Sequence, residues 1–303
     1  QEEHKMSAES DADSVHDAID GFGTDESRLF SIICKRTNAQ LQQMKVAYAM
    51  KHGPLDKALE DELSGDALKL ALAVLEDKHE FFARAIRKAI KDDEEEDLCD
   101  LVLARTPSEC RGIFQAYTKV TGGRNIIQDV TDEVDGNLGK ILLSILQCRR
   151  MDTPADPQAS LADVQCLMYA GEGQIGTNED SFIEILTTRS FPQLYQISFD
   201  YARAYQKSLV SVIKDEFRGK TEKALVRLAR LGQKGLYYAY ILHEAMSGLN
   251  NEDAMIAACV GFKDDARQQV CAAYKSEYDE DLKDRFESET RGDFEKALVA
   301  CVE

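Results

Sequence analysis

The chain has 303 residues, with 37 Lys and Arg against 55 Asp and Glu and a formal net charge of −18. Its 44% of hydrophobic and 30% of charged residues can build folded cores and exclude a disordered chain, while no apolar run approaches the roughly 18 residues of a membrane span. The acidic balance, without Lys/Arg clusters, argues against nucleic acid as the main partner and opposes binding to an anionic membrane unless a cation intervenes.

The order of residues along the chain predicts helices throughout. Residues 1–13 are polar and contain no apolar segment of the kind a signal peptide has. Beyond them the apolar residues recur at helical spacing, as at Leu29 and Ile33, and no alternating strand pattern is evident. Near the middle, Pro154 and Pro157 lie in a polar stretch that predicts a linker. We therefore expect an all-α protein.

The cysteines indicate the compartment in which the chain works. All eight are scattered, with no C-x-x-C pair and no tight cluster with His. This pattern is typical of reduced, mostly buried thiols and predicts a cytoplasmic protein. No spacing of Ser, His or Cys matches a catalytic motif, so enzymatic activity is not expected.

Four marks recur in order four times along the chain: a basic residue, a tyrosine, an acid and then a glycine. The sets are Arg36, Tyr48, Glu62 and Gly65; Arg105, Tyr117, Glu133 and Gly136; Arg189, Tyr201, Glu216 and Gly219; and Lys263, Tyr274, Glu289 and Gly292. Such repetition indicates stacked structural units. It predicts a short tail over 1–9, repeats over 10–78, 79–148, 161–232 and 233–303, and a linker over 149–160.

A glycine-bearing loop precedes the basic residue in repeats one, three and four. Because glycine permits positive φ, successive carbonyls can turn to one side of such a loop, and the acid of the same repeat can face them if the helices fold back. Ca²⁺ takes about 6–8 hard oxygen ligands, so three carbonyls and a bidentate carboxylate leave positions for water or an external phosphate oxygen. A plain glycine turn with a solvated glutamate is the alternative; three loops in register favour the calcium site.

Two of these loops resemble a known calcium motif. Gly21-Phe-Gly23-Thr-Asp-Glu26 is followed by Asp61-Glu62-Leu-Ser-Gly65, and Ala170-Gly-Glu-Gly-Gln-Ile-Gly-Thr177 is followed by Asp215-Glu216-Phe-Arg-Gly219. Both pairs resemble the annexin calcium motif, and the resemblance spans residue 10 to the C-terminus. It implies four five-helix repeats packed as a curved disc, in a protein that binds acidic phospholipid when calcium is present.

The resemblance also implies loop carbonyls and one carboxylate as metal ligands in three repeats. These are Ile19, Gly21 and Gly23 with Glu62; Gly171, Gln174 and Gly176 with Glu216; and Met246, Gly248 and Asn250 with Glu289. Weaker sites are implied where a threonine and a glutamate follow the loop, at Thr24 with Glu26 and at Thr177 with Glu179.

Two repeats depart from the motif. Repeat two has Ile90-Lys91-Asp92 in place of the glycine loop, so Glu133 is expected to hold no calcium, and the acidic run 92–97 is expected to be a solvated face. Repeat four has Asn250 in place of the last glycine. Asn tolerates left-handed backbone better than most residues, so this site is expected to be weakened.

For two further sets of residues, the sequence leaves two interpretations open. The loop tips carry Phe22, Ile175 and Leu249, which could enter a lipid headgroup region or pack on their own loops. The basic series of the four repeats could form buried ion pairs or line a polar channel, and the structural interpretation is favoured.

These features predict a cytoplasmic protein that binds acidic phospholipid membranes peripherally and reversibly, with Ca²⁺ bridging loop oxygens to lipid phosphate. Cytoskeletal proteins and self-association on membranes are further candidate partners, and nucleic acid is not. Two alternatives stay open. One is a cytoskeletal or membrane scaffold with mostly degenerate calcium sites, and the other is an ion-conducting or enzymatic protein built on the same repeats.

Overall fold

The computed structural model describes residues 2–21, 23–173 and 176–303. Within this part of the chain the regular elements are twenty α-helices, and no strand is formed. The predicted all-α class is confirmed. None of the described helices is both long and apolar enough to cross a membrane.

The helices follow one another in four groups of five. Repeat 1 holds α1 (Glu2–Ile19), α2 (Glu26–Lys35), α3 (Asn38–His52), α4 (Leu55–Glu62) and α5 (Gly65–Leu75). Repeat 2 holds α6 (Lys78–Lys91), α7 (Glu95–Val102), α8 (Pro107–Val120), α9 (Ile126–Glu133) and α10 (Gly136–Leu146). Repeat 3 holds α11 (Pro157–Ala170), α12 (Glu179–Thr188), α13 (Phe191–Tyr205), α14 (Leu209–Glu216) and α15 (Gly219–Arg230). Repeat 4 holds α16 (Lys234–Ala245), α17 (Glu252–Phe262), α18 (Arg267–Tyr278), α19 (Leu282–Glu289) and α20 (Gly292–Val302).

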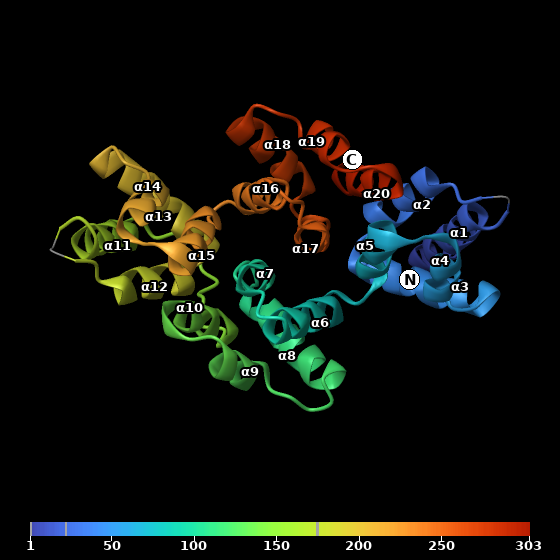
Figure 1. The fold of residues 1–303 in the computed structure, drawn as a ribbon, viewed down its shortest axis with the longest axis horizontal. Helices are drawn as coiled ribbons and strands as arrows, with labels where there is room; N and C mark the ends of the chain where they lie inside the picture. Colours follow the sequence, from blue (N-terminus) through green and yellow to red (C-terminus); the bar gives the residue numbers. More distant parts are fainter. Residues whose placement is uncertain (1, 22, 174–175) are drawn as a thin grey trace. The chain divides into compact units, whose positions relative to one another are not determined.

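The chain divides into two compact units, one of residues 1–81 with 238–303 and the other of residues 82–237. In the first unit α20 packs against α2 and α5, so the last helix of the chain closes against repeat 1 (Figure 1). In the second unit α11 lies against α12 and α13, and α10 of repeat 2 lies against α12 and α15 of repeat 3 (Figure 1).

The same local signals bound the helices in different repeats. In repeats 1 and 2 the third helix begins with a capping box, formed by Thr37 with Gln40 and by Thr106 with Glu109. The recurring glycines have φ of +59°, +66°, +63° and +67° at Gly65, Gly136, Gly219 and Gly292. This is the left-handed region that favours glycine. The recurring glycine of the sequence therefore forms the same backbone turn in all four repeats, at the start of the fifth helix of each repeat.

The four recurring tyrosines are core residues. Their exposed fractions are 2%, 0%, 0% and 0% for Tyr48, Tyr117, Tyr201 and Tyr274. Burial raises the pKa of Tyr201 and of Tyr274 to about 12, because it disfavours the phenolate. In repeat 2 the Tyr117 hydroxyl donates a hydrogen bond of 2.5 Å to the carboxylate of Asp129.

The basic series forms structural contacts inside the two units. Arg36 donates to both carboxylate oxygens of Asp11 at 2.6 and 2.8 Å, and Arg189 donates to both of Asp163 at 2.8 Å. Arg105 is 2% exposed. The interpretation as partly buried ion pairs therefore fits Arg36 and Arg189, each of which ties the start of its own repeat to the end of the second helix.

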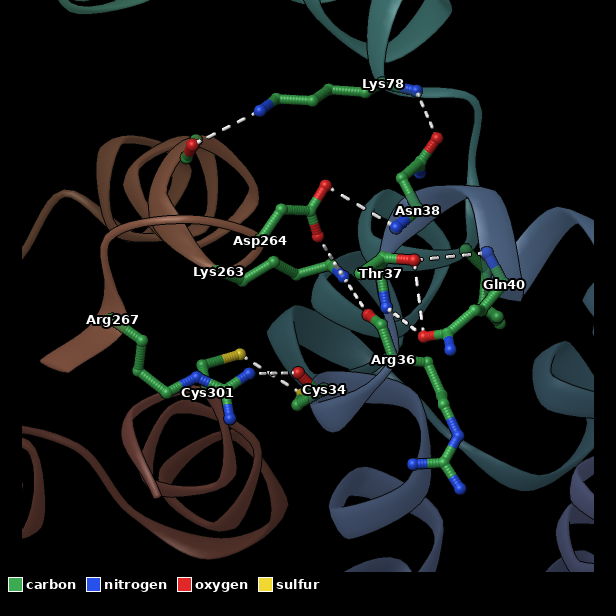
Figure 2. A network of polar contacts seen from close by, with 12 residues as sticks. Cys34, Arg36, Thr37, Asn38, Gln40, Lys78, Lys263, Asp264, Arg267 and Cys301 are labelled. Atoms are coloured by element: carbon green, nitrogen blue, oxygen red, sulfur yellow. Dashed lines mark hydrogen bonds and ion pairs between the residues drawn. The ribbon is translucent and has the colours of Figure 1, made fainter.

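Repeat 4 is joined to repeat 1 by a polar and thiol contact group, which Figure 2 shows. The ammonium of Lys263 donates to the Arg36 carbonyl at 2.5 Å, and the guanidinium of Arg267 donates to the Cys34 carbonyl. The Sγ atoms of Cys34 and Cys301 lie 3.1 Å apart. All eight cysteines are free and five are buried, in agreement with the prediction of mostly buried thiols.

The acidic run of repeat 2 is only in part a solvated face. Three ion pairs join α7 to α15, namely Glu95 with Lys220, Glu96 with Lys223 and Asp100 with Arg227. The last of these is buried, with side chains 10% and 4% exposed. The expectation of a solvated face over 92–97 is wrong for Glu95, which is 16% exposed, because α15, which is distant in sequence, folds against α7. Glu96 is 53% exposed, as expected, and Asp100 lies outside the acidic run.

Candidate metal-binding corners

Each repeat forms a corner from the segment between its first two helices and from the acid that ends its fourth helix. Corner 1 is segment 19–24 with Glu62, corner 2 is 90–93 with Glu133, corner 3 is 171–177 with Glu216, and corner 4 is 246–250 with Glu289. The acid is the last residue of α4, α9, α14 or α19. The fold therefore brings each acid to the same point of its repeat.

One backbone hydrogen bond closes the segment in every corner. The N–H of the residue that caps the second helix donates to an alanine carbonyl of the first helix: Asp25 to Ala18 at 2.8 Å, Glu94 to Ala89 at 2.9 Å, Asn178 to Ala170 at 2.7 Å and Asn251 to Ala245 at 2.9 Å. The enclosed segment is longest in corner 3 and shortest in corner 2. Because the segments differ in length, the four corners cannot all present the same number of backbone carbonyls in the same positions.

Corner 1 brings its acid to the glycine loop. Gly21 and Gly23 have φ of +138° and +94°, and no atom lies within 4 Å of a Cβ built on either. The hydroxyl of Thr24 donates to the carboxylate of Glu62 at 2.7 Å. Ile19, the remaining predicted ligand, ends α1 and is 6% exposed.

Corner 3 repeats this arrangement with a longer loop. Gly176 has φ of +83°, and the hydroxyl of Thr177 donates to the carboxylate of Glu216 at 2.6 Å. A Cβ built at Gly171 would lie 3.4 Å from the Glu216 Cγ, so this side chain lies along the loop backbone. The predicted ligand Gln174 lies outside the described residues, as do the loop-tip residues Phe22 and Ile175.

Corner 4 is built differently. The guanidinium Nη2 of Arg285 donates to the Met246 carbonyl at 2.9 Å and lies 3.1 Å from the carboxylate of Glu289. The side-chain amide of Asn250 donates to the backbone carbonyl of Glu289 at 2.8 Å. Gly248 has φ of +94°. Leu249, at the tip, is 97% exposed.

Asn250 takes the place of the corner threonine rather than of the last glycine. Like Thr24 and Thr177, it directly precedes the residue that caps the second helix. Its φ is not among the positive values found in the described chain, so the left-handed conformation expected for it is not adopted. The loop of repeat 4 is therefore shorter, and its last glycine is absent.

Corner 2 lacks the glycine loop, and arginines bind the carboxylate one helical turn before its acid. Asp93 takes a positive φ of 58° where the other loops use glycine. Asp129, four residues before Glu133, accepts from the guanidiniums of Arg124 at 2.7 Å and Arg87 at 3.4 Å. The Arg124 contact holds the pKa of the Asp129 carboxyl below its usual value despite burial.

The two weaker threonine–glutamate sites have other partners for their glutamates. Glu26 pairs with Lys296 at 3.0 Å, and Glu179 accepts from the side chain of Asn137. The described part of the chain holds no group of three or more His, Cys, Asp or Glu side chains placed to bind a metal. A metal at these corners would therefore need oxygen ligands besides such side chains, such as the loop carbonyls.

In corners 1 and 3 the acid therefore contacts the loop through a threonine hydroxyl, and in corner 4 Arg285, a residue that the motif does not contain, joins the acid to the Met246 carbonyl. The sequence analysis did not predict a role for Arg285, because the calcium motif contains only the loop and the acid. The signal was present four positions before each acid, where the sequence has Ala58, Asp129, Val212 and Arg285.

Comparison with known proteins identifies the class. The family model described as Annexin matches residues 10–74, 81–145, 162–228 and 237–301. The chain belongs to the annexin family. Proteins of this family are generally calcium-dependent phospholipid binders, without a general enzymatic activity, that are peripheral on membranes.

Individual relatives agree along nearly the whole chain. Annexin A13 of Mus musculus is 35% identical over 306 residues, covering 99% of this chain and 96% of the relative. Annexin A1 of Homo sapiens is 33% identical and covers 96% of this chain and 86% of its own. The solved structure of annexin III superposes with a TM-score of 0.84 at 31% identity, covering 98% of this chain and 94% of that one.

Proposed function

We propose that this chain binds acidic phospholipid surfaces in a calcium-dependent way through corners 1 and 3. The observation that carries the proposal is the pair of threonine–glutamate hydrogen bonds, Thr24 to Glu62 and Thr177 to Glu216. In both corners a carboxylate from the end of the fourth helix accepts a hydrogen bond from the loop, which contains positive-φ glycines at Gly21 and Gly23 in corner 1 and at Gly176 in corner 3. Carbonyls and a carboxylate are the oxygen ligands that Ca²⁺ prefers.

The proposed ligands are the carbonyls of Ile19, Gly21 and Gly23 with Glu62, and those of Gly171, Gln174 and Gly176 with Glu216. Glycine lets the loop turn its carbonyls to one side, and the threonine hydroxyl keeps the carboxylate on that side. Ca²⁺ bound there supplies positive charge and coordination positions that a lipid phosphate oxygen can fill. The chain itself carries a net charge of −18 and is repelled by anionic lipid.

Two corners on one chain add by avidity, so each can bind weakly while the whole protein binds firmly. The predicted corner of repeat 4, with Met246, Gly248, Asn250 and Glu289, stays a prediction and is treated below. Corner 2 is not proposed to bind metal, because it has no glycine loop to present carbonyls to Glu133.

The test is co-sedimentation of the full chain with phosphatidylserine/phosphatidylcholine vesicles across a calcium series. We expect binding with calcium and none in excess chelator, and no binding to vesicles of phosphatidylcholine alone. Glu62→Gln and Glu216→Gln should each shift the curve to higher calcium, whereas the matched variant Glu133→Gln should not. Binding that persists in chelator, or equal shifts for all three variants, would contradict the proposal.

The scaffold alternative is favoured by two observations: corner 2 has no glycine loop, and the corner 4 carboxylate of Glu289 is paired with Arg285 of the same helix. Titration calorimetry separates the two functions. A scaffold with degenerate sites gives no calcium heat in the millimolar range, and the proposed function gives heat that Glu62→Gln and Glu216→Gln remove.

A further inference from the structure

The position four residues before the corner acid separates the corners into two kinds. It holds Ala58 in corner 1 and Val212 in corner 3, which leave the carboxylate to the loop threonine. It holds Arg285 in corner 4. Residues four apart on a helix share a face, so the guanidinium of Arg285 lies beside the Glu289 carboxylate on α19.

Arg285 contacts both kinds of oxygen that were predicted to bind a metal in corner 4. Its Nη2 atom lies 2.9 Å from the Met246 carbonyl and 3.1 Å from the Glu289 Oε1 atom. The two side chains are only 24% and 28% exposed. Hydrogen bonds between ionised groups are stronger than neutral ones, and partial burial reduces their screening by salt.

The rest of corner 4 is adapted to this arrangement. Asn250 stands in the threonine position, but it donates to the backbone carbonyl of Glu289 and not to the carboxylate. The carboxylate is thereby left to Arg285. The loop is also shorter, because the last glycine of corners 1 and 3 is absent.

We infer that Arg285 is a tethered cation that takes the place of a metal ion in corner 4. It fixes the loop to the end of α19 without calcium and keeps corner 4 closed at calcium concentrations that fill corners 1 and 3. A divalent ion at this corner would be repelled by the guanidinium and would have to break both of its contacts. The chain then has two corners that bind calcium and one corner, corner 4, whose loop is held by Arg285 whether or not calcium is present. This inference rests on the proposed function for corners 1 and 3.

The first experiment counts calcium ions by titration calorimetry of the full chain without lipid. Arg285→Ala, which gives corner 4 the residue of corner 1, should bind one further calcium ion per chain. Adding Glu289→Gln to that variant should remove the gain. Lys283→Ala, which deletes a charge from the same helix away from the corner, should leave the count unchanged. No gain in Arg285→Ala overturns the inference.

The second experiment uses Glu289→Gln in the otherwise native chain and does not depend on Arg285→Ala folding. Its calcium count should equal that of the native protein, and its thermal midpoint in excess chelator should fall, because Arg285 loses its partner. A lower calcium count, or an unchanged midpoint in chelator, overturns the inference.

The failure of the proposed function would be distinct. In that case Glu62→Gln and Glu216→Gln would leave the calcium count of the native chain unchanged. The stability of Glu289→Gln in chelator would still report on Arg285.

Discussion

The hydroxyl of Thr177 donates a hydrogen bond of 2.6 Å to the Oε2 atom of Glu216, although the two residues are 39 positions apart. Thr24 and Glu62 form the same bond at 2.7 Å across 38 positions. In each case the carboxylate is already directed at the loop, so a metal ion would find its charged ligand in place. Less reorganisation is then needed for binding.

Calcium should stabilise the protein through these two corners. A ligand that binds only the folded state adds about 2.7 kcal/mol at a concentration one hundred times its Kd. We expect the thermal midpoint to be higher in millimolar calcium than in chelator. The double variant Glu62→Gln/Glu216→Gln should lose most of this difference, and the Glu133→Gln control should keep it.

Thr37 should stabilise the start of α3 through its capping box with Gln40. Thr37→Ala is expected to lower the free energy of unfolding by about 1 kcal/mol. Ser64 precedes α5 without a side-chain cap bond, so Ser64→Ala serves as the matched control and should be nearly neutral. Denaturation midpoints of the two variants check this; equal losses would show that the capping contact is not the cause.

The ion pairs between α7 and α15 should differ in strength by their burial. Arg227→Met leaves the Asp100 carboxylate, 10% exposed, without its partner and should cost about 3–5 kcal/mol. Lys223→Met removes an exposed pair with Glu96 and should cost less than about 1 kcal/mol. Thermal unfolding of both variants decides the matter, and comparable losses would contradict the assignment.

Buried tyrosines should make the fold sensitive to alkali. The pKa of Tyr201 in the folded chain is about 12, against an ordinary value of 10.0. Between these pH values the unfolded chain binds fewer protons than the folded one, so stability falls as pH rises from about 10 toward 12.

Tyr201→Phe isolates this effect, because the Tyr201 hydroxyl has no hydrogen-bond partner in the described structure. The variant should match the native protein in denaturation midpoint at pH 7 and lose less stability at pH 11. Tyr195, which is 47% exposed, provides the control, and Tyr195→Phe should show the native alkaline loss. Identical alkaline curves for all three proteins would refute the prediction.

Thiol reactivity should follow burial. Cys166 is exposed, whereas Cys34 and Cys301 are fully buried in contact with each other. A bulky disulfide reagent should label Cys166 rapidly in the native protein and reach the buried pair only on unfolding. Cys166→Ser should abolish the rapid phase, and rapid labelling of Cys34 in that variant would contradict the packing of α2 against α20.

Local features of the sequence were sufficient to predict the all-α fold class and the residues that recur in each repeat. The recurring tyrosines are core residues and the recurring glycines form one positive-φ turn, because burial of a large ring and a left-handed backbone each demand a particular residue type. The curved arrangement of the repeats and the exact repeat limits stay predictions.

The sequence by itself determined which residues could bind a cation: glycine loops, an acid at the end of a helix and a threonine before the next helix. Only the tertiary structure decided which partner each carboxylate meets. Glu62 and Glu216 meet a loop hydroxyl, whereas Glu289 meets Arg285. The physical reason is that a carboxylate's charge is neutralised by whichever cation the fold brings within hydrogen-bond distance, and that distance is not written in the spacing of the motif.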